Sequence, residues 1–167
     1  MKTMLICAAL IAIIATPSLV EAARVNIPKE GKFAFDFCPV GRGKTFSAGE
    51  RLFVMNYDLD AILRTTPSGE VFDRMGARCF GIYANINTRQ QESGFCELTD
   101  VDGDKWWMDY RGNPDGTGGT YIAVHGTGKY EGMALRGEYR IDNNWGSISR
   151  EVSFQGCNPN TGTYKLK

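Results

Sequence analysis

The chain of 167 residues carries 19 basic and 19 acidic side chains, so its formal net charge is zero. A neutral protein has no long-range electrostatic field that would gather nucleic acid or anionic lipid, and the sequence contains no run of basic residues. We therefore expect no nucleic-acid partner. The length suits one domain that is large enough to bury a hydrophobic core.

Residues 1–22 have the organisation of a secretory signal peptide. Lys2 precedes an apolar run at residues 4–15, and residues 20–22 (Val-Glu-Ala) place an aliphatic and a small side chain at the −3 and −1 positions of a cleavage site. The apolar run is shorter than the roughly 20 residues that a membrane-spanning helix needs, so an uncleaved anchor is the weaker alternative. We expect cleavage, export to the periplasm or out of the cell, and a mature domain of residues 23–167 without a membrane span.

Four cysteines follow the leader: Cys38, Cys79, Cys96 and Cys157. An even number in an exported protein favours two disulfides, for which three connectivities exist. Cys79 and Cys96 flank a predicted hairpin, so we expect them to pair, which leaves Cys38 with Cys157 as a link between the first and last strands. A zinc site is the weaker alternative, because no C-x-x-C spacing occurs and His125 is the only histidine. No metal is expected.

The mature sequence consists of predicted strands and turns. At residues 31–37, three phenylalanines alternate with Lys, Ala and Asp in the period-2 pattern of a half-buried strand. Residues 50–63 are ambiguous, because their first half alternates like a strand while the spacing of Leu and Ile in the second half suits a helical turn. Further segments are rich in aromatic and β-branched residues and are bounded by Gly, Asn, Asp or Pro, at residues 78–87, 92–100, 105–112, 119–126, 135–142 and 147–156.

These segments make about eight strands, and no stretch has the length, caps and 3.6-residue period of a helix. Eight antiparallel strands in one small exported domain favour a closed barrel or a sandwich. Closure removes the exposed strand edges that invite aggregation, so we favour the barrel. The expected fold is all-β, a single eight-stranded antiparallel β-barrel.

The glycine-rich stretch GTGKYEG, residues 126–132, has the look of a phosphate-binding loop. A dinucleotide fingerprint would need its third glycine one position before Gly132, and a P-loop would need Ser or Thr at Tyr130. Neither flanking segment has helix character. We interpret the stretch as a bend that lets two strands pack closely.

The acidic stretch DVDGD, residues 100–104, has the look of a calcium loop. Counted from Asp100, the sixth position is Lys105 and the twelfth is Arg111, where an EF-hand needs Gly and a bidentate Glu. The Asp-Gly pair is instead typical of a hairpin turn.

Aromatic and polar side chains in the strands supply candidates for an interior site. Trp106 and Trp107 are adjacent, so they must point to opposite faces of their strand and one of them should enter the interior. Inward polar groups would turn an apolar cavity into a small-ligand site, whereas the alternative is that the aromatic residues simply fill the barrel. The candidate cavity residues are Asn56, Tyr57, Arg64, Phe80, Tyr83, Glu97, Trp106, Tyr110 and His125.

His125 is the one side chain whose ordinary pKa lies near neutrality. Strand alternation places it on the same face as Tyr121 and Ala123. It is a candidate general acid or base, with a structural role at the strand end as the alternative. The sequence contains no G-x-S-x-G motif and no supported reactive cysteine, so no catalytic residue is assigned.

Two segments, GFCELTDVDGDKWWMDY and GGTYIAVHGTGKYEGMALRGEY, resemble the allene oxide cyclase barrel-like family of small exported bacterial proteins. In that family an acidic DxDGD hairpin precedes a glycine-rich GGTGKxxG segment and another strand. The likeness covers residues 79–140 and implies a calycin-like eight-stranded barrel with an interior cavity. Plant allene oxide cyclases bind a fatty-acid epoxide and steer its ring closure, but their catalytic residues have no matching positions here, so no catalytic residue is carried over.

Three functions follow as hypotheses. We favour a binding module that holds a small, largely apolar molecule in the barrel, without a cofactor. The alternative is a cofactor-independent isomerase or cyclase that uses inward polar groups such as Tyr57 and His125. A third is a structural or interaction role in the cell envelope. Polar groups that converge in an open cavity would favour chemistry, an evenly apolar cavity would favour carriage, and a packed interior would favour neither. The sequence assigns no ligand and no oligomeric state.

Overall fold

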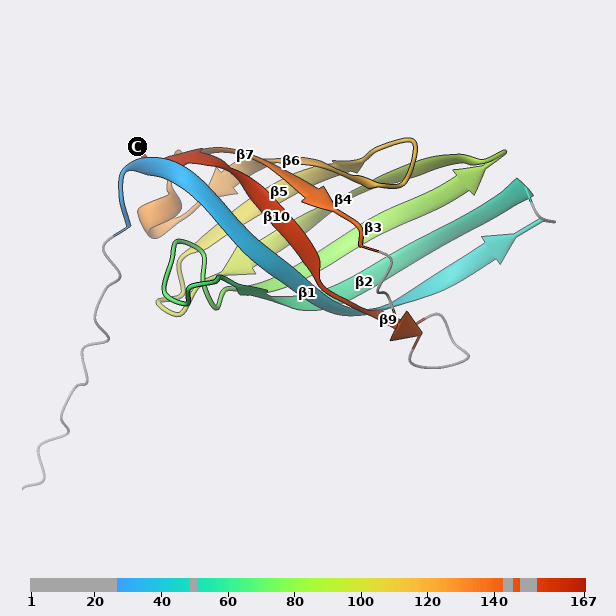
Figure 1. The fold of residues 1–167 in the computed structure, drawn as a ribbon, viewed down its shortest axis with the longest axis horizontal. Helices are drawn as coiled ribbons and strands as arrows, with labels where there is room; N and C mark the ends of the chain where they lie inside the picture. The colour runs from blue at the N-terminus through green and yellow to red at the C-terminus, as the bar shows by residue number, and fades with distance from the viewer. Residues whose placement is uncertain (1–26, 49–50, 143–145, 148–152) are drawn as a thin grey trace, which may run out of the picture.

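The computed structural model describes residues 27–48, 51–142, 146–147 and 153–167, so the predicted leader lies outside the described residues. Eight long strands form the wall of the fold: β1 (Glu30–Ser47), β2 (Leu52–Arg64), β3 (Gly76–Ile86), β4 (Arg89–Thr99), β5 (Lys105–Gly112), β6 (Gly118–Gly126), β7 (Ala134–Arg140) and β10 (Asn158–Lys165). All neighbours pair antiparallel, and β10 bonds to both β7 and β1, which closes the ring. In Figure 1 the blue β1 and the red β10 lie side by side. The predicted eight-stranded antiparallel barrel is confirmed.

The strand that closes the ring differs from the predicted one. Residues 147–156 were expected to form the eighth strand. Their described part contains only the end of β8 (Gly146–Ser147) and the short β9 (Ser153–Gln155), which pairs with residues 40–42 of β1. Residues 148–152 lie outside the described residues. The closing strand is β10, whose sequence NPNTGTYK is polar and contains Pro and Gly, residues depleted in strands. Its alternate side chains Asn158, Asn160 and Tyr164 are nevertheless buried.

The ambiguous second segment is a strand throughout, and the helical-turn alternative is wrong. β2 bonds to β1 along one edge and to β3 along the other, so its backbone groups are satisfied by two ladders. Tyr57, Leu59 and Leu63 point into the barrel and are buried. The same alternation holds in β1, where Phe33 and Phe35 are buried as expected.

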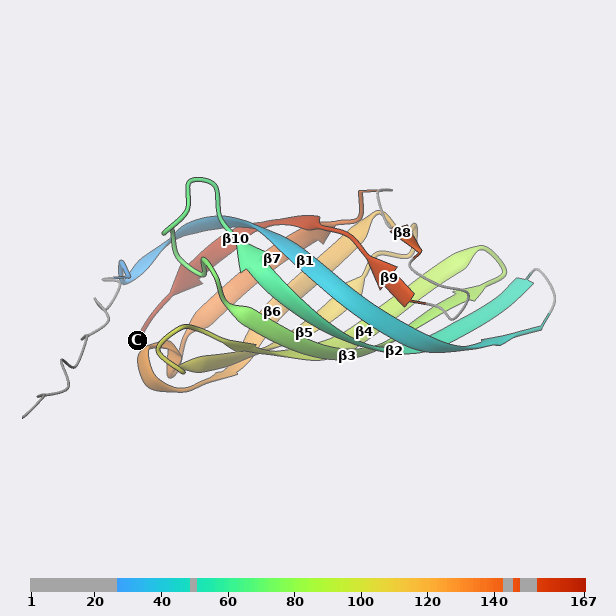
Figure 2. The same cartoon turned by 90° about the horizontal axis from the view of Figure 1, so that it is seen from below.

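One end of the barrel is filled by the loop between β2 and β3. Phe72 in this loop is 3% exposed, and its ring lies 5.3 Å from Phe33, 5.5 Å from Trp106 and 5.6 Å from Tyr164, between centroids. Figure 2 shows the green loop at the same end as the C-terminus. Aromatic contacts of this kind add to the burial of apolar area. This end of the barrel is therefore a packed core.

Both expected disulfides are present. Cys79 on β3 is bonded to its direct cross-strand neighbour Cys96 on β4. Cys38 on β1 is bonded to Cys157, which immediately precedes β10. Two disulfides are consistent with an oxidising compartment. In the described part of the chain, no helix is long and apolar enough to cross a membrane.

Candidate functional site: a cavity with a tyrosine–glutamate cluster

A cavity of about 440 Å³ occupies the end of the barrel opposite Phe72. Its walls come from the inward positions of the ring strands, together with residues from the segments that follow β7 and precede β10. Most of the lining is apolar and includes Phe53, Met55, Leu59 and Met108. The volume falls in the range of small-molecule sites, about 300–1,000 Å³.

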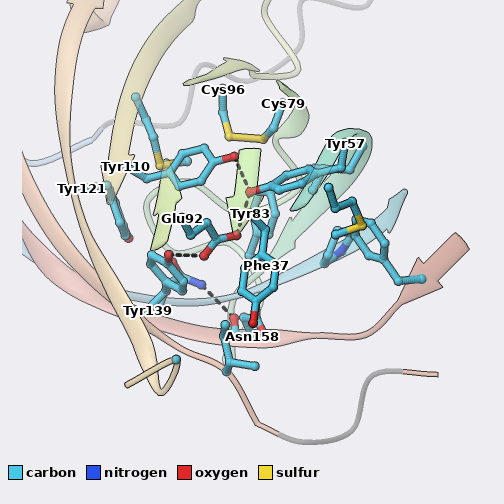
Figure 3. Close-up of a pocket in the computed structure, with 18 of the residues that line it drawn as sticks. Phe37, Tyr57, Cys79, Tyr83, Glu92, Cys96, Tyr110, Tyr121, Tyr139 and Asn158 are labelled. Carbon is cyan, nitrogen blue, oxygen red and sulfur yellow. Dashed lines mark hydrogen bonds between the residues drawn. A yellow bond between two sulfur atoms is a disulfide. The ribbon is translucent and has the colours of Figure 1, made fainter. Parts of the chain in front are cut away.

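Four polar side chains converge on one wall of this cavity, and we call them the tyrosine–glutamate cluster: Glu92, Tyr57, Tyr110 and Tyr139. The Tyr57 hydroxyl donates to Glu92 Oε1 over 2.6 Å, and the Tyr139 hydroxyl donates to Glu92 Oε2 over 2.7 Å. The hydroxyl oxygens of Tyr57 and Tyr110 are 2.7 Å apart. Because the Tyr57 proton is directed to Glu92, Tyr110 is the donor of that bond. Figure 3 shows this group beside the Cys79–Cys96 disulfide.

A row of residues across four strands makes the cluster possible. Tyr57 on β2 is paired with Gly81 on β3, which is paired with Gly94 on β4, which is paired with Tyr110 on β5. A Cβ atom at Gly81 would lie 2.3 Å from the Tyr110 hydroxyl oxygen and 2.5 Å from Cζ of Tyr57. Glycine at these positions therefore gives the two rings the space to lie across the sheet and meet.

The tyrosines of the cluster are held in their neutral, proton-donating form. Burial raises the pKa of Tyr57 above its ordinary value, and the negative charge of Glu92 raises it further. Tyr139 has a raised pKa for the same two reasons. For Tyr110, burial raises the pKa, and the negative charge of Glu92 raises it further. The cluster thus offers a carboxylate held by neutral phenols in a mostly apolar cavity.

Two further buried polar atoms at the cavity have no hydrogen-bond partner among the described residues. They are the Tyr121 hydroxyl and Asn158 Oδ1, and their side chains are 3% and 7% exposed. Burial also raises the pKa of Tyr121, so its hydroxyl remains a donor. A buried polar group without a partner costs about 1–3 kcal/mol. Both atoms belong to residues that line the cavity, where a bound molecule would meet them.

The sequence candidates divide between the cavity, the packed core and the outer surface. Tyr57, Tyr83 and Tyr110 line the cavity, and the Tyr83 hydroxyl donates to Gln90 Oε1 over 2.8 Å. Trp106 is inside but belongs to the packed end, where its indole N–H is 3.5 Å from Met75 Sδ. The expectation that the two tryptophans separate is confirmed, since Trp106 is 0% exposed and its neighbour lies on the outer face.

Four other candidates need correction, because strand alternation turns them outward. Asn56 and Arg64 are exposed on β2, where the inward positions are Tyr57 and Leu63. Phe80 is 56% exposed on β3 next to the inward Cys79. Glu97 on β4 likewise lies beside the buried Cys96, and its carboxylate accepts a hydrogen bond from Lys105 Nζ over 2.7 Å. These four side chains do not line the cavity.

His125 is also outside, and a β-bulge is the reason. In the β5–β6 pair, Met108 opposes Ala123 but Trp107 opposes His125, so Val124 is an extra residue on β6. The extra residue reverses the alternation beyond that point. His125 is therefore exposed, with its ring centroid 5.1 Å from that of Trp107 on the outer surface. Simple alternation, which placed it on the face of Tyr121, is wrong here.

Glu92, the central residue of the cluster, was not among the residues predicted from the sequence. Its signal was available in the disulfide, because Cys96 must face its partner across the pair and Glu92 lies four residues earlier on the same strand face. Tyr121 and Tyr139 were missed as site residues as well. Their participation depends on the glycines opposite them, since Gly137 opposes Tyr121 and Gly119 opposes Tyr139.

The two loop motifs meet at the packed end. GTGKYEG forms the β6–β7 connection with a short 3₁₀ turn, η2 (Gly128–Tyr130), and Tyr130 is buried. Lys129 Nζ lies 2.7 Å from Asp100 Oδ2, 2.5 Å from Asp102 Oδ2 and 3.4 Å from Asp104 Oδ2. The lysine thus binds the acidic β4–β5 hairpin. No group of three or more His, Cys, Asp or Glu side chains suited to a metal occurs among the described residues.

No protein-family model and no curated protein sequence matches this chain. Two solved structures are similar in fold, both pterocarpan synthase dirigent proteins. PsPTS1 has 14% identity and a TM-score of 0.48, covering 83% of this chain and 97% of its own. GePTS1 has 11% identity and a TM-score of 0.46, covering 84% and 88%. At these values the likeness carries no functional argument, and neither protein is an allene oxide cyclase.

Proposed function

We propose that the protein binds a small, largely apolar molecule in the barrel cavity. The observation that carries this is the tyrosine–glutamate cluster on one wall of an otherwise mostly apolar cavity of about 440 Å³. Apolar walls bury the body of a ligand, and a few placed polar groups orient it. The unpartnered hydroxyl of Tyr121 supports the proposal, because a hydrogen bond from it to a ligand would remove the cost of its burial.

A cavity-filling variant tests this function. Met55 lines the cavity, and Met55→Trp would fill part of it, while Val124 is 48% exposed on the outside and Val124→Trp leaves the cavity unchanged. We expect the neutral fluorescent probe N-phenyl-1-naphthylamine to bind the wild type and the Val124 variant and to bind the Met55 variant at least about tenfold more weakly. Equal binding by all three proteins would refute a ligand site in the barrel.

A second candidate function is the cofactor-independent isomerase or cyclase. The observation that favours it is the convergence of a carboxylate and phenol donors at one point of an open cavity. Glu92 would serve as a general base through its remaining lone pairs. The cluster hydroxyls would stabilise negative charge that develops on a substrate oxygen. The catalytic set would then be Glu92 and its tyrosines, in place of Asn56 and His125.

Native mass spectrometry of protein from its own host provides the test for this candidate. A small molecule that co-purifies would be released, identified and incubated with ligand-free protein. Conversion to an isomer of equal mass, lost in Glu92→Gln, would support catalysis. Recovery of the unchanged molecule in both samples would contradict catalysis and leave binding as the function.

We also propose export through the leader at residues 1–22. The two disulfides support this, since they form in oxidising compartments. The mass of the mature protein tests it directly. We expect a chain that begins at residue 23 and lacks four hydrogens, whereas a full-length, reduced chain in the cytoplasm would contradict export.

A further inference from the structure

The charged side chains that line the cavity are of one sign, negative. Glu92 is the one acidic residue that lines it, and no Lys, Arg or His lines it in the described part of the chain. Glu92 forms no ion pair there, and its two oxygens accept hydrogen bonds from Tyr57 and Tyr139. An ionised carboxylate has about four acceptor sites, so each oxygen retains capacity for a further donor. A partly buried carboxylate held by phenols alone lacks a counter-charge.

The remaining wall is aromatic. Eight rings line the cavity, and they include those of Tyr57, Tyr110, Tyr139 and Phe154. Tyr57 and Phe154 meet edge to face with centroids 5.9 Å apart, and Tyr110 and Tyr139 do so at 6.5 Å. The hydroxyls of the cluster are engaged with one another and with Glu92. Ring faces attract cations through their quadrupole and offer nothing comparable to an anion.

These two features distinguish among ligand charges. A carboxylate ligand would meet Glu92 in a site of low dielectric without any cation to offset the repulsion. A neutral alcohol would gain hydrogen bonds but no charge interaction. An ammonium group would donate to the free lone pairs of Glu92 in a charge-assisted bond and lie against the ring faces. Its apolar body would rest on side chains such as Met55, Leu59 and Met108.

We propose that the cavity selects an apolar molecule bearing a protonated amine, with Glu92 as its counter-ion, and that it rejects carboxylates. This inference rests on the proposed binding function and specifies the ligand class for the same cavity. The phenols that donate hydrogen bonds to Glu92 hold its negative charge in a fixed position at one wall of the cavity. Selection is thus set by one side chain and can be removed with it.

A matched set of probes tests the proposal. Isothermal titration calorimetry at pH 7 on the mature, disulfide-bonded protein would compare 4-phenylbutylamine, 4-phenylbutan-1-ol and 4-phenylbutanoate, which share one apolar body. We expect the amine to bind about tenfold more tightly than the alcohol, since a charge-assisted hydrogen bond exceeds a neutral one by about this factor. The carboxylate should bind most weakly.

Glu92→Gln provides the discriminating variant, with Glu97→Gln on the outer face of the same strand as its control. In Glu92→Gln the amine should lose about tenfold and match the alcohol, while alcohol binding persists and shows that the cavity has formed. Glu97→Gln should behave as the wild type. Binding without a preference for the amine, or a preference that survives Glu92→Gln, would overturn this inference alone. If none of the three probes binds the wild type, the proposed binding function fails and this inference fails with it.

Discussion

The hydroxyl oxygens of Tyr57 and Tyr110 lie 2.7 Å apart, although two strands separate β2 from β5 in the sheet. The two rings meet above Gly81 and Gly94, which have no side chains to block them. The Tyr57 hydroxyl in turn donates a hydrogen bond to Glu92. Tyr110 therefore donates to Tyr57 and Tyr57 donates to Glu92 Oε1, while Tyr139 donates to Glu92 Oε2. These linked hydrogen bonds fix the carboxylate of Glu92 at one wall of the cavity.

Gly81→Ala should disrupt the cluster. A Cβ atom there would lie 2.3 Å from the Tyr110 hydroxyl oxygen and 2.5 Å from Cζ of Tyr57, so both rings must move. We expect a loss of about 1–3 kcal/mol in the free energy of unfolding, measured with urea. Gly76→Ala on the same strand is the control, because its nearest atom, the Thr99 carbonyl oxygen, is 4.0 Å away. An equal decrease in the free energy of unfolding in both variants would show that the close contact of the two rings with Gly81 does not contribute to stability.

Tyr57→Phe should cost more stability than Tyr83→Phe. The Tyr57 hydroxyl donates to Glu92 and accepts from Tyr110, so its removal leaves two partners unsatisfied. The Tyr83 hydroxyl has one bond, to Gln90, in a less buried position. We expect losses of about 1–3 kcal/mol for Tyr57→Phe and about 0.5–1 kcal/mol for Tyr83→Phe in urea unfolding. The reverse order would contradict the linked hydrogen bonds.

Asp73 should make the β2–β3 loop sensitive to acid. Burial acts to raise its pKa, but hydrogen bonds from Thr65 N–H, the Ser68 hydroxyl and Gly69 N–H lower the pKa from 3.8 to about 2. A pKa that is lower in the folded state contributes stability above pH 3.8 and loses it as pH falls toward 2. After allowance for solvent screening, this contribution is about 1–2 kcal/mol.

The measurement is the free energy of unfolding at several pH values for the wild type and Asp73→Asn. We expect the variant to be less stable at pH 7 and the gap to close as pH falls from about 4 to about 2. The exposed Asp60→Asn on β2 is the control and should leave the stability at pH 7 unchanged. A gap that is constant down to pH 2 would show that the hydrogen bonds to Asp73 do not depend on its charge.

Lys129→Met should destabilise the packed end at neutral pH. The variant leaves the carboxylate of Asp100, which is 7% exposed, without its cation, at a cost of roughly 1–2 kcal/mol. Lys105→Met, which removes the more exposed pair with Glu97, should cost less than about 0.5 kcal/mol. Equal losses for the two lysines in urea unfolding would show that the three aspartates do not act on Lys129 together.

Unfolding at alkaline pH tests whether the ion pairs of Lys129 with the aspartates stabilise the fold. Burial acts to lower the pKa of Lys129, but the carboxylates of Asp100 and Asp102 outweigh it, so the pKa lies above its ordinary value of 10.5. A raised pKa contributes stability that is complete below pH 10.5 and is lost as pH rises through the folded value. The difference between wild type and Lys129→Met should therefore shrink above pH 10.5, and a widening difference would contradict the ion pairs.

Much of the wall of the barrel was predictable from the sequence. The alternation of Phe33 and Phe35, the separation of Trp106 from its neighbour, and the pairing of Cys79 with Cys96 were all expected and are all present. These features depend on the period-2 pleat and on contacts between strands that follow one another in the chain. Local sequence therefore determines them.

The location of His125 and the closing role of β10 were not predictable in this way. His125 is turned outward by one extra residue, Val124, whose insertion is visible only when β6 is aligned with β5. β10 has a polar sequence and becomes a strand because β1 and β7 both offer it free backbone groups. Propensity and alternation contain no information on either pairing.

By itself, the sequence determined the strand alternation, the antiparallel wall and the Cys79–Cys96 pair, because each follows from pleat geometry and short-range neighbours. Only the tertiary structure decided which inward side chains meet. Glu92 lies 35 positions from Tyr57 and 47 from Tyr139 in the chain, and it joins them because glycines on intervening strands leave room for the rings. The register of distant strands creates the site, and that register is a property of the closed barrel as a whole.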